Sequence, residues 1–311
     1  MREVKLKIDG FKWWVRADQL SLFDHFLSWE KTADGRVHRL LRRSFRGKVT
    51  TLVPTREGEI LTIRGWRHAI GWPFIPSQAE REWQMTNLML DKGIPTIVPV
   101  AYGERRWLGA LRESALITVG LPDVCNLLQF SQRLAGMPPK ERRAAKGALA
   151  RVLADLLSQA HKEGIFHSDL NGGNILVRTR GNLSIELFIT DAHKILRHNP
   201  MPSLRAKNLA KLAPFFSDGY SRSDRLRFLR HYLGPEGQDQ MKSFAEAVEK
   251  EAGGKLIEFY RERDERCFRD NWDFATLLAP QIKGWARRAS LTQALQTFLF
   301  ELDRVFKSRD F

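Results

Sequence analysis

The chain has few cysteines, no long hydrophobic run and too few acidic residues to balance its basic ones. Only Cys125 and Cys267 occur in 311 residues, so the fold cannot depend on a disulfide framework and a reducing compartment is expected. The start of the sequence, MREVKLK, carries charges where a signal peptide would need an apolar stretch. No window approaches the roughly 18 continuous apolar residues of a membrane-spanning helix. We therefore expect a cytoplasmic protein.

The excess of basic residues indicates which partners the chain favours. Lysine and arginine total 51 and aspartate and glutamate 36, which gives a formal net charge of +15 and favours anionic partners. Two clusters of basic residues stand out: Arg39, Arg42, Arg43, Arg46 and Lys48, and then Arg222, Arg225, Arg227 and Arg230. Because no recognisable nucleic-acid-binding module accompanies them, we expect no nucleic-acid partner. We expect instead a peripheral contact with the anionic inner face of the cytoplasmic membrane.

Two short segments combine an aspartate, an asparagine and a second aspartate at spacings typical of phosphoryl transfer. The first, FHSDLNGGNILV, contains Asp169 and Asn174 with four residues between them, and the second, FITDAHK, places Asp191 at the end of an apolar strand. Transfer from ATP needs a carboxylate that orients the acceptor hydroxyl and takes its proton, and an amide and a carboxylate that hold Mg2+. The ordered set predicts a kinase-like catalytic half, with Asp169, Asn174 and Asp191 as catalytic residues. Asn174 and Asp191 are the expected metal ligands, and His167 is expected to brace the loop.

The order of the expected elements indicates an α+β, protein-kinase-like fold of two lobes. In residues 1–120 we expect a β-rich small lobe with one long helix, which Ser77 opens as the first residue of a capping box. Its strands are expected at 3–16, 37–46, 48–55, 59–66, 97–102 and 115–119. Residues 121–123 are read as a hinge. In residues 121–311 we expect a mainly helical large lobe that holds the catalytic loop and ends in a helical extension.

The nucleotide site of the small lobe is less strongly marked. Gly47 lies where a loop covering the nucleotide is expected, but a full GxGxxG is absent, so a plain hairpin turn explains it equally well. Arg64 stands where the phosphate-binding lysine of kinases is expected, and an arginine can hold phosphate and pair with a helix glutamate. Lys48 is a possible substitute for Arg64. Glu82 is the expected partner of Arg64. Glu80 is the rival candidate, and it ranks second because the helix cap can occupy its carboxylate.

Taken together, these motifs resemble the lipopolysaccharide kinase family, which includes the Kdo kinases and the core-heptose kinases of Gram-negative bacteria. The resemblance covers roughly residues 37–215. It is carried by HSDLN with NILV at 167–177 and by ITDAHK at 189–194, where the family pattern is Asp-x-Asp-Lys and His193 replaces the second aspartate. Further matches are REW at 81–83, GIPT at 93–96, PVAYGER at 99–105 and NLAKL at 208–212. On this pattern Lys194 joins the expected nucleotide-binding residues.

The resemblance implies an ATP- and Mg2+-dependent transfer of the γ-phosphoryl group to a sugar hydroxyl, of Kdo or heptose, in the lipopolysaccharide inner core. Two alternatives stay open at this point. An aminoglycoside- or choline-type kinase of small molecules uses the same loop chemistry. A non-catalytic scaffold could use the same fold to bind lipid or protein, although the intact set of Asp169, Asn174 and Asp191 favours activity.

Overall fold

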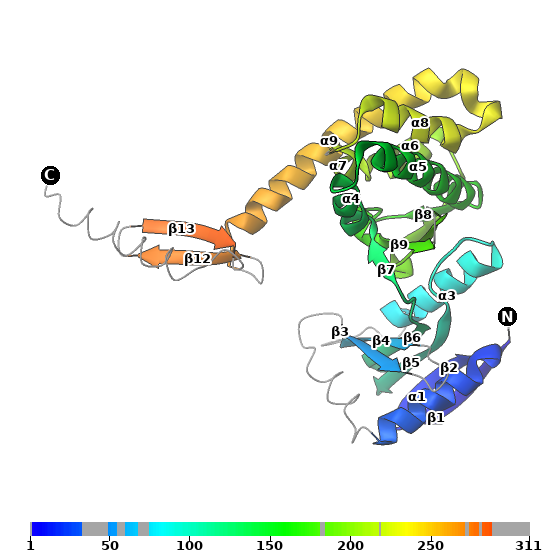
Figure 1. The fold of residues 1–311 in the computed structure, drawn as a ribbon. Coiled ribbons are helices and arrows are strands. Elements are labelled where there is room, and N and C mark those ends of the chain that lie inside the picture. The colour runs from blue at the N-terminus through cyan, green and yellow to red at the C-terminus, as the bar shows by residue number, and fades with distance from the viewer. Residues whose placement is uncertain are drawn as a thin grey trace, which may run out of the picture. The chain divides into compact units, whose positions relative to one another are not determined.

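The computed structural model describes residues 2–32, 49–54, 60–67, 75–180, 184–217, 219–270, 274–279 and 282–287. Contacts divide the chain into two compact units, Met1–Val248 and Glu249–Phe311. The first unit has a β-rich amino-terminal part and a helical carboxy-terminal part (Figure 1), which confirms the predicted fold class. The lobe boundary expected near residue 120 lies inside this unit and stays a prediction.

The amino-terminal part is built on one antiparallel sheet with the strand order β1-β2-β5-β6-β4-β3. Its strands are β1 (Glu3–Ile8), β2 (Phe11–Arg16), β3 (Val49–Pro54), β4 (Ile60–Arg67), β5 (Pro99–Trp107) and β6 (Ala110–Val119). The predicted strands at 3–16, 48–55, 59–66 and 115–119 are confirmed. The one predicted at 37–46 lies outside the described residues.

Alternation along the strands gives this sheet two apolar faces. Trp13 packs on Phe23 and Phe26 of α1 (Leu20–Thr32), with ring centroids 5.3 and 5.9 Å apart. Trp14 points to the opposite face, as alternate residues of a strand must, and its ring stacks on Tyr102 at 4.6 Å. The helix α3 (Gln78–Asp91) contributes Trp83 to that second cluster. Both faces are therefore covered, and α3 is held firmly against the sheet.

The start of α3 follows from its cap. The Ser77 hydroxyl accepts a hydrogen bond from the backbone N–H of Glu80 at 3.0 Å, as the sequence predicted. Because Glu80 lies in the first turn and Glu82 half a turn further on, the two carboxylates leave the helix in different directions. Glu80 is partly exposed, whereas Glu82 is buried. The cap therefore decides which glutamate faces the interior.

The carboxy-terminal part packs helices around short strands. Its elements are β7 (Val124–Asn126), α4 (Leu127–Ala135), α5 (Pro139–Lys162), β8 (Ile165–His167), β9 (Ile175–Arg180), β10 (Ser184–Ile189), β11 (Ile195–Arg197), α6 (Pro202–Ala210), α7 (Ala213–Ser217), α8 (Arg222–Leu233) and α9 (Met241–Cys267). The apolar stripe of α5, with Leu149, Leu153 and Leu157, is buried in its core. Of the helices that the structure describes, none is both long and apolar enough to cross a membrane.

The second unit contains the rest of α9, up to Cys267, and only beyond it differs from the helical extension that the sequence predicted. Residues 274–287 contain an antiparallel hairpin of β12 (Phe274–Ala279) and β13 (Ile282–Arg287). Phe274 and Trp285 therefore lie on strands, and the centroid of the Trp285 ring lies 5.1 Å from that of Phe268. The physical reason is Pro280, which cannot continue a helix and separates two short apolar runs.

Candidate active site

The loop between β8 and β9 holds Asp169 in a fixed orientation at the surface. Its two carboxylate oxygens accept hydrogen bonds from the amide nitrogens of Asn171, at 2.9 Å, and Asn174, at 3.2 Å. Asn174 also donates to the carbonyl oxygen of Asp169 at 2.8 Å. Asp169 is nevertheless exposed. A carboxylate that is both oriented and accessible can meet an acceptor hydroxyl, which is the geometry that a general base requires.

Beneath this loop, His167 acts as the brace that the sequence led us to expect. It is buried, its Nε2 contacts the carbonyl oxygen of Thr190 at 2.9 Å, and its Nδ1 accepts from the backbone N–H of Asp169 at 3.1 Å. Burial lowers the pKa of His167, and a neutral ring with its proton on Nε2 satisfies both contacts. His167 therefore fixes the backbone on which Asp169 stands.

A buried relay of hydrogen bonds connects this brace to three helices. Asn208 of α6 donates from Nδ2 to the carbonyl oxygen of His167 at 2.8 Å, which leaves its Oδ1 to accept from His161 Nε2 at 2.9 Å. His161 Nδ1 then accepts from the Tyr232 hydroxyl at 2.6 Å, and that hydroxyl accepts from Arg205 Nε at 2.8 Å. Each group donates in the same direction, toward the catalytic loop. No pattern in the sequence pointed to His161 or Tyr232, because the relay joins residues far apart in the chain.

The relay predicts acid-sensitive folding. Burial lowers the pKa of His161 to about 4, below its ordinary 6.5, so the unfolded chain binds this proton first as the pH falls. The contribution of neutral His161 to the free energy of unfolding is fully present above about pH 6.5. It is lost progressively as the pH falls toward 4, by on the order of 3 kcal/mol. We expect the urea midpoint to fall between about pH 7.5 and about pH 5. In His161→Gln the fall is expected to be smaller, and an equal fall in both proteins would contradict this assignment.

The ladder between β9 and β10 brings Asn174 and Asp191 to the same place. Ile175 pairs with Ile189, so Asn174 lies opposite Thr190, whose backbone N–H donates to the Asn174 carbonyl at 3.0 Å. Asp191 follows directly and adopts a left-handed backbone conformation with φ of 56°. An amide oxygen and a carboxylate from adjacent chain segments form an oxygen donor set, which suits Mg2+. The residues present therefore fit the expected metal ion.

Arg64 of β4 makes two ion pairs, and the one with Asp191 joins the two parts of the first unit. Its Nη1 lies 2.8 Å from Glu82 Oε1 and 3.0 Å from Asp191 Oδ1. The side chains of Arg64 and Glu82 are 11% and 5% exposed, so this contact is largely screened from water. Among the described residues Glu80 contacts Gln84 instead. The geometry therefore matches Glu82 as the partner of Arg64, and it adds the contact of Arg64 with Asp191.

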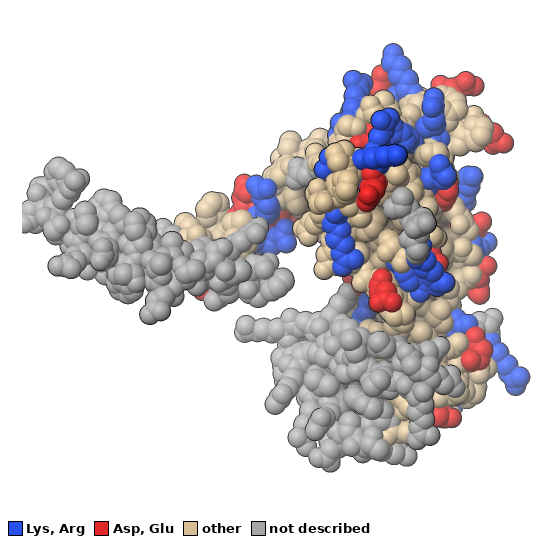
Figure 2. Space-filling model, in the orientation of Figure 1, with Lys and Arg blue, Asp and Glu red and all other residues tan. Residues whose placement is uncertain are grey.

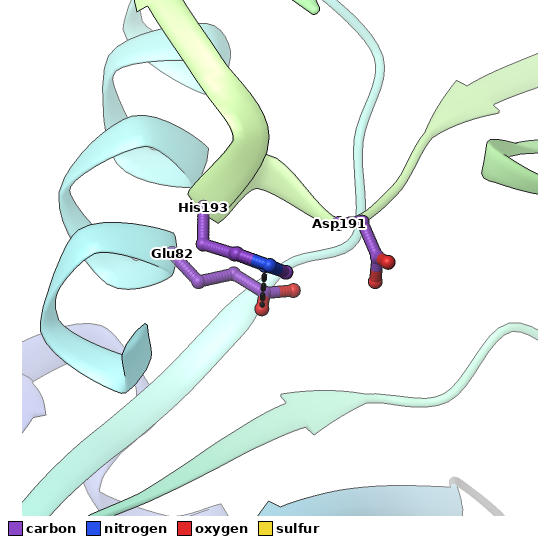
Figure 3. Close-up of side chains that lie close together, drawn as sticks. All are labelled: Glu82, Asp191 and His193. Carbon is purple, nitrogen blue, oxygen red and sulfur yellow. Dashed lines mark ion pairs between the residues drawn. The ribbon is translucent and has the colours of Figure 1, made fainter. Parts of the chain in front are cut away.

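His193 completes this cluster from the turn after β10 (Figure 3). Its Nδ1 lies 3.4 Å from Glu82 Oε2, and both side chains are buried. Glu82, Asp191 and His193 offer ligand atoms within 4.8 Å of one another, which is the spacing of a metal site. Arg64, however, already binds two of the three with its positive charge. Mg2+ also prefers oxygen ligands to the imidazole nitrogen that His193 offers, so Asn174 and Asp191 stay the predicted metal ligands.

The remaining predicted site residues are only partly placed. Lys194 has an exposed side chain, and its carbonyl oxygen accepts from the backbone N–H of Ser168 at 2.8 Å, which ties its turn to the catalytic loop. The Lys211 ammonium contacts the carbonyl oxygen of Ser168 from the other side. Gly47 and Lys48 lie outside the described residues, so their roles stay predictions.

Comparison with known proteins identifies relatives of this arrangement. Residues 61–232 match the model of the lipopolysaccharide kinase (Kdo/WaaP) family. The lipopolysaccharide core heptose(I) kinase WaaP of Pseudomonas aeruginosa is 31% identical over 209 residues, which cover 64% of this chain and 72% of that protein. WaaP of Escherichia coli is 27% identical over 171 residues, 53% of this chain and 63% of that protein. The solved structure of WaaP in complex with acyl carrier protein matches 68% of this chain and 87% of that chain, at 26% identity and a TM-score of 0.51.

Proposed function

Because the chain belongs to the lipopolysaccharide kinase (Kdo/WaaP) family, we propose that it transfers the γ-phosphoryl group of ATP to a sugar hydroxyl, of heptose or Kdo, in the lipopolysaccharide inner core. The observation that carries this proposal is the convergence of Asp169, Asn174, Asp191 and Arg64 from three separate segments. The family match spans all four residues. The two relatives named above are core heptose(I) kinases, which favours heptose over Kdo as the acceptor.

Each residue of the site has a distinct role in this proposal. Asp169 orients the acceptor hydroxyl and takes its proton, and the amides of Asn171 and Asn174 hold its carboxylate in place. Arg64 binds the phosphates of the nucleotide, and Glu82 holds the Arg64 guanidinium in position. Asn174 and Asp191 would hold Mg2+, which neutralises charge on the phosphate oxygens when bound. Most of the catalytic effect then comes from positioning and electrostatics.

A peripheral contact with an anionic membrane is part of the proposal, since its substrate is a lipid-linked saccharide. The net charge of +15 supports it. Figure 2 shows lysine and arginine side chains spread over the helical part of the first unit. Between α5 and α8 lies a groove of about 340 Å³, lined by Pro139, Arg142, Arg143, Lys146, Ser221, Ser223, Asp224 and Arg227. Four of these side chains are cationic and one is anionic, so the charge of the groove favours contact with an anionic surface.

The proposal is tested by supplying γ-labelled ATP and Mg2+ with separate acceptors. A heptose-containing core lipopolysaccharide, a Kdo-bearing lipid A, and soluble aminoglycosides and choline are each offered to the wild-type protein. Label in a lipopolysaccharide acceptor is expected and identifies the sugar. Label in the soluble acceptors alone would make the protein a small-molecule kinase. Absence of label together with absence of a thermal shift by MgATP would favour a non-catalytic scaffold.

Replacement of Glu82 tests the pairing with Arg64. Glu82→Gln removes the charge that holds the guanidinium, so the KM for MgATP is expected to rise about tenfold, the effect of losing one charge-assisted hydrogen bond. Glu80→Gln is the matched control, because it makes the same change two residues earlier on the same helix. We expect the control to bind nucleotide as the wild type does. Equal increases in KM for both variants would show that Glu82 has no special role.

A further inference from the structure

The hairpin between β5 and β6 ends in an exposed apolar tip. Trp107 and Leu108 are adjacent in sequence, and their exposed fractions are 62% and 86%. Single apolar residues on a protein surface are common and need no explanation. Two large neighbouring ones at the far end of a hairpin are different, because this position is open to a partner and contributes nothing to the core.

The backbone of the tip makes the choice of leucine unfavourable for the isolated protein. Trp107 pairs with Ala110, so the loop has two residues, Leu108 and Gly109, and both have positive φ, at 49° and 81°. This combination is that of a type I′ turn, whose first position favours asparagine, aspartate or glycine. A leucine there is strained and is also exposed to water. Folding alone therefore does not account for Leu108.

Basic residues surround the tip on the same end of the sheet. Gly10, in the turn between β1 and β2, would place a Cβ 3.6 Å from the Arg105 side chain, which shows that this turn lies beside the last residues of β5. Beside that turn Lys7 lies directly opposite Lys12 in the ladder, and both are exposed. Two like charges at facing positions weaken a sheet. An anionic surface at this end would relieve that repulsion.

The tip itself adds an aromatic ring with a cation over it. The guanidinium of Arg112 lies 5.3 Å from the centre of the Trp107 ring. Arg105 and Arg106 are paired with Glu113 and Glu104, at 2.5 and 2.9 Å. Asp9 lies in the turn beside Lys7, so basic residues outnumber acidic ones at this end without being the only charges there. Tryptophan prefers the boundary between lipid and water, where its ring is apolar and its N–H is hydrated.

We propose that the tip formed by Trp107 and Leu108 docks into the headgroup region of an anionic bilayer, while Lys7 and Lys12 contact the lipid phosphates. The acceptor of the proposed function is carried by a membrane lipid, so docking raises its local concentration; to this extent the inference rests on that function. The tip lies at the end of β6 opposite Val119, which leads to the catalytic part of the unit. It can therefore insert without burying the catalytic loop.

The test is co-sedimentation of the full chain with vesicles of phosphatidylglycerol and phosphatidylcholine in equal parts, and with vesicles of phosphatidylcholine alone. The wild type is expected to bind the anionic vesicles more tightly. In Leu108→Asn binding is expected to fall about tenfold, as one leucine side chain leaves the lipid. The thermal midpoint of that variant is expected to rise, because asparagine suits the turn. Loss of binding with a gain in stability cannot come from unfolding.

Two further variants complete the test. Lys7→Gln combined with Lys12→Gln is expected to reduce binding to anionic vesicles about tenfold and to leave binding to neutral vesicles unchanged. Met201→Gln removes an exposed apolar side chain elsewhere in the unit, since Met201 is 59% exposed, and is expected to bind as the wild type does. Unchanged vesicle binding in Leu108→Asn would overturn the proposal. The proposal would also be overturned if the wild type bound no vesicles but formed a dimer that dissociates in Leu108→Asn, because the tip would then be a contact between two copies of the chain.

The same variants separate this inference from the proposed function. With lipid-linked acceptor in anionic vesicles, Leu108→Asn is expected to lower kcat/KM about tenfold, in parallel with binding. With a soluble, deacylated core oligosaccharide it should be as active as the wild type. If no saccharide is phosphorylated by any variant, the kinase proposal fails while the vesicle result still stands.

Discussion

Replacement of Asp169 by asparagine is expected to lower kcat for phosphoryl transfer about 10³-fold and to leave the KM for MgATP nearly unchanged. The reason is that Asp169 contacts the acceptor in our account and has no role in binding nucleotide. Asparagine keeps the size of the side chain but has only one accepting atom, so one of the two side-chain bonds from Asn171 and Asn174 is lost. The bond from Asn174 to the backbone carbonyl of residue 169 is expected to keep the loop in place. Initial rates at saturating acceptor, together with the thermal midpoint with and without MgATP, measure both effects.

The control for this experiment is Asp155→Asn, since Asp155 is an exposed aspartate on α5 outside the site. It is expected to have the activity of the wild type. A loss of activity in both variants would point to a general effect of charge removal. A fully active Asp169→Asn protein would show that the carboxylate does not take part in the reaction.

Replacement of Asp191 by alanine is expected to abolish magnesium-dependent turnover of nucleotide, with a loss of about 10³-fold or more in kcat/KM. This side chain is the only carboxylate in the expected donor set for Mg2+, and it also contacts Arg64 at 3.0 Å. We expect MgATP to stop raising the thermal midpoint of the variant. Circular dichroism is expected to be unchanged, because Asp191 is at a turn outside the apolar core.

Comparison of Asp191→Ala with His193→Ala separates the residues that hold Mg2+ from those that position Glu82. His193→Ala removes the neighbour of Glu82 and leaves both expected metal ligands in place. It is expected to weaken nucleotide binding modestly while keeping the dependence on Mg2+. If instead His193→Ala abolished that dependence and Asp191→Ala did not, the metal ion would belong with Glu82 and His193.

The parts of the site that could be predicted from sequence are those in which local spacing fixes the geometry. Asp169 and Asn174 lie five positions apart in one loop, so their contact follows from local spacing. We predicted Glu82 and not Glu80 as the partner of Arg64, because one side chain cannot both cap a helix and form a buried ion pair. The structure places Glu82 beside Arg64. Such features depend on one or two elements whose periodicity is visible in the sequence.

What the sequence could not predict depends on distant segments or on competing signals. The relay from Arg205 to His167 joins α5, α6 and α8, and although His167 and Asn208 lie in recognised motifs, no local pattern links them to His161 and Tyr232. The contact between Arg64 and Asp191 spans 127 positions. The hairpin at 274–287 was read as helix because its apolar residues also fit a helical period, and only Pro280 argued otherwise. Short apolar runs are ambiguous in this way.

The most direct test of the account is a single-turnover transfer of γ-labelled phosphate to heptose-containing core lipopolysaccharide, with enzyme in excess over ATP. Wild type and Asp169→Asn are compared under conditions in which both bind MgATP, and the labelled product is located by mass spectrometry. We predict rapid transfer to a sugar hydroxyl by the wild type and a rate about 10³-fold lower in the variant. Equal rates in the two proteins, or release of free phosphate without a labelled saccharide, would contradict the account.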